Sequence, residues 1–191
     1  MKKILVASLI PFLLLFSFNI QNNKKLDDEW KVNFDLPHGA YDAIKTEDGY
    51  VIVSGWPDIW LTKIDGHGNI IWQKCISGGW EVPKSIIEVD DGFVIVGDKG
   101  LEKSDIFLIK ADKSGEIIWK RTYGEKNIDD FGAKVIEATD GFLLVGTRMK
   151  VPGEGMPLVI KTDENGNEIW NKTYTENEGE WGGDAIKIED G

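Results

Sequence analysis

Short runs of alternating apolar and polar residues, separated by glycine-rich turns, fill the chain from about residue 40 onward. The stretch DKSGEIIWK, from Asp112, shows the pattern most clearly: a polar turn, then an alternating strand that carries a tryptophan. It recurs as DGHGNIIWQK from Asp65 and as DENGNEIWNK from Asp163. No helical period of 3.6 residues is sustained after residue 22. The chain is therefore predicted to be an all-β repeat protein.

Each copy of the repeat is predicted to contain four short strands. The first strands carry the segments that begin at Ala43, Ser85, Ala133 and Ala185. The second strands follow Asp-Gly pairs, a strong signal for a tight hairpin in which glycine accepts a positive φ, at Gly49, Gly92 and Gly141. The third and fourth strands are joined by D-x-x-G turns, whose left-handed residues are expected to be Gly68, Gly115 and Gly166.

Four antiparallel strands in each 40 to 50 residues are typical of β-propeller blades. The fourth strands carry Trp72, Trp119 and Trp170, which we interpret as packing residues between neighbouring blades rather than ligand contacts. The predicted blades span about 40–79, 80–128 and 129–179, and a partial blade spans 180–191. Residues 22–39 form a linker with one orphan strand, Glu29–Phe34. The expected architecture is an open arc of about three blades.

The hairpin with its tryptophan resembles the tryptophan-docking repeat of pyrroloquinoline-quinone-type propellers, D-x-x-T-G-x-x-x-W, with a turn one residue shorter. Residues 105–124, DIFLIKADKSGEIIWKRTYG, are also similar to repeats of exported bacterial and archaeal propeller proteins. The resemblance covers about residues 29–191 and implies the propeller fold. The G-H…W-D pair of WD-like propellers does not occur. Quinone binding is not carried over and no cofactor is expected, because the single cysteine excludes the vicinal disulfide that often accompanies it.

An open arc would leave apolar blade faces uncovered. Two interpretations follow: the chain is a truncated piece of a longer propeller, or it self-associates to complete the ring. The position of the last residue inside a predicted hairpin favours truncation.

Residues 1–21 differ in composition from the rest of the chain. Lys2 and Lys3 precede the apolar run Ile4–Phe18, which is typical of a signal peptide or an N-terminal anchor. The protein is therefore expected to be exported, and then secreted, periplasmic or anchored through this segment. The net charge of −11 and the lack of basic runs argue against a nucleic-acid partner. The single cysteine, Cys75, is expected to be a half-buried strand residue.

No catalytic constellation or metal-ligand set is evident in the sequence. His38 and His67 are isolated, and DENGN from Asp163 fits a hairpin turn better than a calcium loop, because its glycine comes at the fourth position. The weak ligand-binding candidates are aromatic residues in polar loops before the first strands, namely Tyr41, Trp80, Phe131 and Trp181. Nearby acids are Asp42, Glu81, Asp129, Asp130, Glu180 and Asp184. The competing interpretation is that these aromatic residues cap the core.

The loops between second and third strands vary in length and are therefore expected to carry specificity. They are WP at Trp56, DKGLEKS from Asp98, and a long one, TRMKVPGEGM from Thr147. The favoured function is a non-catalytic extracytoplasmic binding or scaffolding module with a protein or carbohydrate ligand. The alternative is a fragment of a propeller enzyme, a glycan hydrolase or lyase or a quinoprotein. Its candidate groups would lie on the first strands, at Lys45, Glu88, Glu137 and Lys187.

Overall fold

The computed structural model describes residues 39–174 and 183–184. Several predictions lie outside these residues: the signal or anchor at 1–21, the orphan strand at 29–34, the ligand candidate Trp181, and the last first strand with Lys187.

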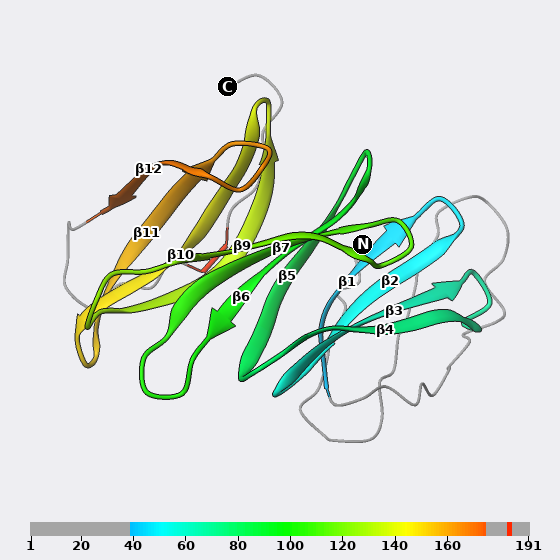
Figure 1. Ribbon diagram of the computed structural model, residues 1–191, viewed down its shortest axis with the longest axis horizontal. Coiled ribbons are helices and arrows are strands. Elements are labelled where there is room, and N and C mark those ends of the chain that lie inside the picture. Colours follow the sequence, from blue (N-terminus) through cyan, green and yellow to red (C-terminus); the bar gives the residue numbers. More distant parts are fainter. Residues whose placement is uncertain (1–38, 175–182, 185–191) are drawn as a thin grey trace, which may run out of the picture.

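The described chain folds into three four-stranded antiparallel sheets, and no helix occurs in it (Figure 1). In each sheet, strands that follow one another in sequence are hydrogen-bonded neighbours. Sheet A contains β1 (Ala40–Thr46), β2 (Gly49–Gly55), β3 (Asp58–Asp65) and β4 (Ile70–Gly78). Sheet B contains β5 (Glu81–Val89), β6 (Gly92–Lys99), β7 (Asp105–Asp112) and β8 (Ile117–Tyr123). Sheet C contains β9 (Asp129–Ala138), β10 (Gly141–Val151), β11 (Glu154–Thr162) and β12 (Glu168–Thr173).

The three sheets stack in sequence order, with sheet B between sheets A and C. Along the stack β5 contacts both β1 and β9, so the first strands of the sheets are neighbours. The fourth strands β4, β8 and β12 form the opposite edges of the sheets, and Figure 1 shows β4 and β12 at the two outer sides of the molecule. Because consecutive residues of a strand point to opposite faces, the apolar middle of each strand can contribute to two cores.

Two apolar cores join the sheets. The first lies between sheets A and B and includes Val53 and Leu61 from one side and Ile95 and Phe107 from the other. The second lies between sheets B and C and includes Leu108 and Leu158. The paired faces explain why the central strands are apolar on both sides instead of alternating with polar residues.

The Asp-Gly hairpins turn one residue earlier than the sequence predicted. The two turn residues precede the glycine, as Glu47 and Asp48 do in sheet A, and the glycine is the first residue of the next strand. Gly92 does not have the expected positive φ. What requires glycine at all three positions is close approach, since a Cβ atom would overlap a third-strand carbonyl oxygen, that of Ile64, Ala111 or Thr162.

The D-x-x-G turns have one geometry in all three sheets. Their glycines have φ of 86°, 82° and 72° at Gly68, Gly115 and Gly166. In sheet B the Oδ1 of Asp112 accepts the backbone N–H groups of Ser114, at 2.8 Å, and Glu116, at 2.9 Å. Asp65 and Asp163 accept the corresponding N–H groups. These carboxylates thus close the turns of hairpins.

The fourth-strand tryptophans of sheets A and B lie on the D-x-x-G turn of the following sheet. Trp72 packs against the first core, and a Cβ atom on Gly115 would lie 3.0 Å from its ring. Trp119 of sheet B makes the same contact with the turn of sheet C. A Cβ atom on Gly166 would lie 2.8 Å from its ring. The equivalent Trp170 on β12 is 45% exposed. The turn glycine therefore has a second purpose, which is to leave room for an indole ring.

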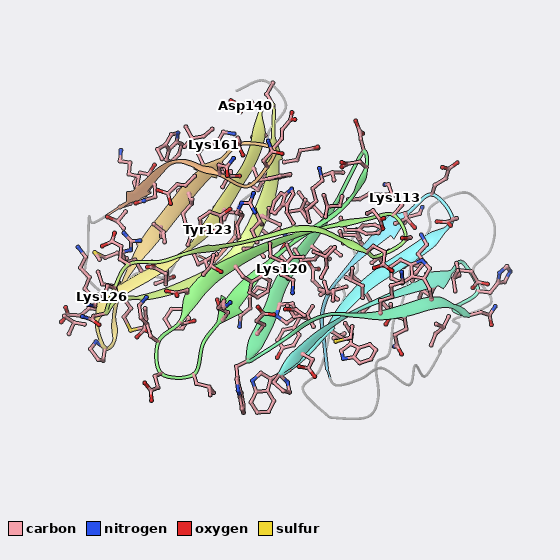
Figure 2. All side chains as sticks on the ribbon, viewed as in Figure 1. Lys113, Lys120, Tyr123, Lys126, Asp140 and Lys161 are labelled. Carbon is pink, nitrogen blue, oxygen red and sulfur yellow. The ribbon has the colours of Figure 1, made fainter. Side chains whose placement is uncertain are left out.

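A repeated ion pair, which the sequence analysis did not identify, links the third strand to the Asp-Gly turn. Lys63 pairs with Asp48, Lys110 pairs with Asp91 at 2.8 Å, and Lys161 pairs with Asp140 at 2.7 Å. Figure 2 labels the last pair at the upper end of sheet C. The lysine side chains are largely buried, whereas the aspartates are exposed. Each buried lysine stem therefore ends in an ion pair with a carboxylate at the surface.

The first strands begin earlier than the apolar pattern indicated. Each contains a bulge that displaces one residue from the ladder, at Tyr41, Lys84 and Ala133. The predicted long loop from Thr147 is also wrong, because β10 and β11 continue as a hairpin and leave only a short turn at Pro152 and Gly153. A buried bidentate pair holds this extension: Arg148 donates to Asp130 on β9 at 2.8 and 2.9 Å.

Candidate functional site

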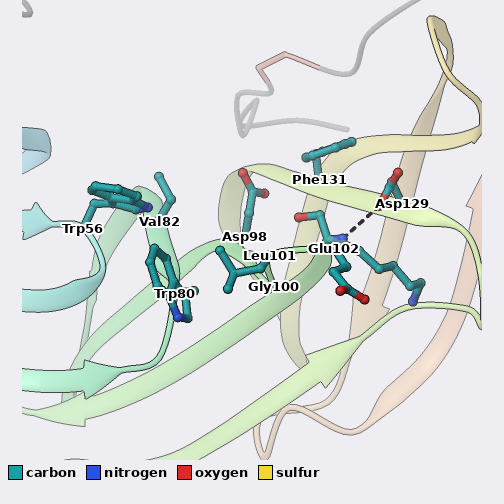
Figure 3. A pocket seen from close by; sticks show the side chains of 11 residues that line it. Trp56, Trp80, Val82, Asp98, Gly100, Leu101, Glu102, Asp129 and Phe131 are labelled. Atoms are coloured by element: carbon teal, nitrogen blue, oxygen red, sulfur yellow. Dashed lines mark hydrogen bonds between the residues drawn. The ribbon is translucent and has the colours of Figure 1, made fainter.

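A pocket of about 360 Å³ opens where loops of all three sheets converge (Figure 3). Its walls come from the turn after β2, the β4–β5 loop, the ends of β5 and β6, the β6–β7 loop and the start of β9. The lining residues are Trp56, Trp80, Val82, Asp98, Gly100, Leu101, Glu102, Lys103, Ser104, Asp129 and Phe131.

One end of the pocket is formed by two tryptophans. The rings of Trp56 and Trp80 are in edge-to-face contact, with centroids 5.7 Å apart and planes inclined by 67°. Both side chains remain about half exposed, at 51% and 42%. Trp80 has φ of 66°, an uncommon conformation for a bulky residue, and its carbonyl accepts the N–H of Gly100 at 3.1 Å. The β4–β5 and β6–β7 loops therefore hold the indole in place.

The opposite end of the pocket is formed by the start of β9. Phe131 points toward the pocket there, and Asp129 lies beside it (Figure 3). The Oδ1 of Asp129 accepts the backbone N–H of Ser104 at 2.8 Å, and the N–H of Asp130 donates to the carbonyl of Ser104 at 2.8 Å. These two bonds fasten the β6–β7 loop of sheet B to sheet C. The pocket thus has a fixed wall instead of a free loop.

Asp98, at the end of β6, lies between the two aromatic ends (Figure 3). Its carboxylate accepts the backbone N–H of Gly132 at 2.6 Å and lies 3.3 Å from the ammonium of Lys84. Burial raises the pKa of Asp98 above its ordinary value, and the Lys84 ammonium opposes this shift. Asp98 therefore both connects sheets B and C and supplies charge to the pocket.

The structure brings together two of the four aromatic candidates. Trp80 and Phe131 line the pocket, whereas Tyr41 lies on the β1 bulge, outside the lining, with the ammonium of Lys84 5.9 Å from its ring centroid. Trp181 lies outside the described residues. The aromatic candidates do not occupy equivalent positions in the three sheets: by strand register Tyr41 corresponds to Lys84 and Ala133, while Phe131 corresponds to Val82.

The acids named beside these aromatic residues mainly support the structure. Asp42 accepts the N–H of Ile86 at 3.0 Å and so links β1 to β5. Glu81 is buried, accepts the hydroxyl of Ser77 and has a pKa raised by burial. Asp130 is fully buried against Arg148. Of the described acids in that set, only Asp129 lines the pocket.

Trp56 and Asp98 belong to the site but were not singled out as ligand-binding residues in the sequence. Both lie in or beside second-to-third-strand loops, which the sequence analysis named only as variable regions. One signal could have found them: in every predicted sheet, the loop between the second and third strands lies at the same end as the loop before the first strand. Contact between loops of different sheets, however, depends on how the sheets stack.

The other predicted positions lie away from the pocket. Lys45, Glu88 and Glu137 are exposed on first strands, and Glu88 pairs with Lys113 at 2.6 Å. Cys75 is exposed instead of half-buried, because β4 is an edge strand in which only Ile76 and Ser77 are buried. Among residues 39–174 and 183–184, no group of three or more His, Cys, Asp or Glu side chains is arranged to hold a metal ion.

No known family model matches this sequence, and no curated protein is significantly similar to it. Within the part of the chain that the structure describes, no helix is long and apolar enough to span a bilayer.

Proposed function

We propose that sheets A, B and C are successive blades of a β-propeller-type array. Three observations support this: the strand order is the same in every sheet, the first strands are neighbours, and the fourth strands are outermost. The repeated contact of a tryptophan with the turn of the next sheet supports it further.

We propose that the protein is a non-catalytic extracytoplasmic binding module whose ligand occupies the pocket between Trp80 and Phe131. The observation that carries the proposal is a concave site built jointly by three sheets, with half-exposed aromatic rings at its ends and polar groups between them. Ligand sites of this kind combine aromatic surface with a few placed polar groups. An extracytoplasmic location is supported by the composition of residues 1–21.

The bonding of two of the three pocket acids, Asp98 and Asp129, supports binding rather than acid–base catalysis. Asp98 is held by Lys84 and Gly132, and Asp129 is held by Ser104. A general acid or base must be able to exchange a proton with a substrate. Carboxylates that connect two sheets are better suited to fixing the shape of the site.

Binding of the full chain to glycan and peptide arrays tests the proposed function. The double variant Trp80→Ala/Phe131→Ala should lose at least about nine-tenths of any specific signal, because stacking on aromatic rings supplies much of the contact energy. The double variant Ile71→Ala/Ile118→Ala is a matched control, since it removes two half-exposed apolar side chains from the outer strands β4 and β8. Circular dichroism should show unchanged β-sheet content in both variants. Equal binding by wild type and the pocket variant would contradict the proposal.

A further inference from the structure

The pocket contains more negative than positive charge. Three carboxylates line it, those of Asp98, Glu102 and Asp129, against one ammonium, that of Lys103. Asp98 is paired with Lys84 at 3.3 Å, so the carboxylates of Glu102 and Asp129 are the part of this charge that no ion pair among the described residues balances. Lys103 is already neutralised by Asp105, whose carboxylate lies 2.5 Å from its Nζ. Within the described part of the chain, no ion pair engages the exposed carboxylate of Glu102. The pocket therefore offers an uncompensated negative charge to a ligand.

The aromatic end of the pocket favours the same kind of ligand. Because the rings of Trp56 and Trp80 are inclined by 67°, they present surfaces in two orientations within one wall. The faces of indole rings carry negative electrostatic potential and attract cations, indole most strongly among the aromatic side chains. Phe131 supplies a third ring on the opposite side of Asp98.

Hydrogen-bonding capacity separates a cationic ligand from a neutral sugar. Sugar hydroxyls both donate and accept, whereas an ammonium or guanidinium group only donates. In the lining, the carboxylates of Glu102 and Asp129 take part in no ion pair among the described residues, whereas Asp105 already occupies the one lining ammonium, that of Lys103. The net charge of −11 on the whole chain adds a long-range attraction for cations.

We infer that this pocket binds an organic cation, an amine or guanidinium group on an apolar stem, with the charge beside Glu102 and Asp98 and the stem against Trp80. The inference rests on the proposed function of the pocket as the ligand site.

Titration of the full chain with n-butylguanidinium and with its neutral isostere n-butylurea tests the inference. The readout is the NMR shift of the indole N–H signals of Trp56 and Trp80. Butylguanidinium should bind about tenfold more tightly than butylurea, because charge is the main difference between the probes. The preference should shrink as salt is added. A methyl glucopyranoside serves as the neutral sugar probe.

Two variants locate the charge effect. Glu102→Gln should weaken butylguanidinium binding about threefold or more and leave butylurea binding unchanged. Glu137→Gln is the matched control, because it removes an exposed carboxylate at the opposite end of β9. An equal loss in both variants would overturn the inference.

The pH dependence gives a second readout. The groups that face Asp98 are Lys84 of β5, Glu102 and Lys103 of the β6–β7 loop, and Asp129 of β9. As the pH is lowered, protonation of Asp98 removes a negative charge from the pocket, and cation affinity should fall. Because burial raises the pKa of Asp98, this fall should begin at a higher pH than it would for an aspartate with an ordinary pKa. Asp98→Asn should remove that early step.

The outcomes separate the inference from the function on which it rests. Equal affinity for the charged and neutral butyl probes, or tighter binding of the glucopyranoside, would overturn the cationic ligand but keep the pocket as a binding site. Absence of saturable binding by all three probes would overturn both proposals.

Discussion

Trp119 and Gly166 show how one large side chain and one missing side chain join two sheets. The indole leaves β8 and reaches the turn of sheet C, where a Cβ atom on Gly166 would lie 2.8 Å from the ring. Trp119 also contacts Phe142, with ring centroids 6.2 Å apart. The turn residue thus needs glycine both for its left-handed conformation and for the space that the ring fills.

Trp119→Ala should lower the free energy of unfolding by about 2–3 kcal/mol, because a half-buried indole leaves a gap between two sheets. Trp170→Ala, the equivalent change on β12, should cost less than about 1 kcal/mol, since that side chain is 45% exposed. Urea denaturation followed by circular dichroism measures both. Equal losses would contradict the role of Trp119 in joining the sheets.

The Arg148–Asp130 pair gives a second prediction at the residue scale. Asp130→Ala should cost about 3–5 kcal/mol, because it leaves a buried guanidinium without its bidentate partner. Glu125→Ala should cost less than about 1 kcal/mol, since that carboxylate reaches Arg148 from a half-exposed position. Thermal unfolding of the two variants distinguishes these outcomes, and similar melting temperatures would disprove the assignment.

At the scale of the hairpin, the recurring unit is a turn closed by one carboxylate. The pKa of Asp112 is lowered, first by the hydroxyl of Ser114 and then by the N–H of Glu116. The pKa values of Asp65 and Asp163 are lowered in the same way by the asparagine four residues on. The ionised form is therefore favoured in the folded chain relative to the unfolded chain.

This preference predicts a stability that depends on pH. The contribution is fully present above the unfolded pKa, about 3.8 for aspartate, and is lost as the pH falls through the lower folded pKa. The triple variant Asp65→Asn/Asp112→Asn/Asp163→Asn keeps an acceptor for the backbone N–H groups but cannot titrate. Its melting temperature should fall less steeply than that of the wild type between about pH 4 and pH 2. Parallel curves for the two proteins would show that these turns do not contribute.

At the scale of the whole molecule, each sheet depends on its neighbours for burial. Sheets B and C share the second core, and Tyr123 adds a hydrogen bond from its hydroxyl to the carbonyl of Gly166 at 2.6 Å. Stability in such stacked units is approximately the sum of the stabilities of the units and of the interfaces between neighbours.

Weakening one interface should therefore uncouple one sheet. In the double variant Trp119→Ala/Tyr123→Phe, the amides of β9 to β12 should exchange with solvent through an opening of lower free energy than those of β2 and β3. Native-state hydrogen exchange measures this difference. A uniform loss of protection over all three sheets would mean that the chain unfolds as one cooperative unit.

Different parts of the candidate site were predictable to different degrees. Trp80 and Phe131 could be selected because each is an aromatic residue in a polar segment before an apolar strand. Trp56 and Asp98 could not be joined to them, because the two lie 42 positions apart in the sequence and only the stacking of the sheets brings them to one pocket. The long loop from Thr147 was wrongly predicted because Arg148 is charged, and its buried partner on β9 could not be seen in the sequence.

The sequence by itself determined the all-β class, the four strands of each repeat and their hairpin order. These follow from local alternation and from turn chemistry, which act over a few residues. Only the tertiary structure decided which faces of the sheets meet, why the space at the turn positions admits only glycine, and which loops form the pocket. Those features depend on contacts between sheets, such as Trp119 on Gly166 and Asp129 on Ser104, whose partners are distant in sequence.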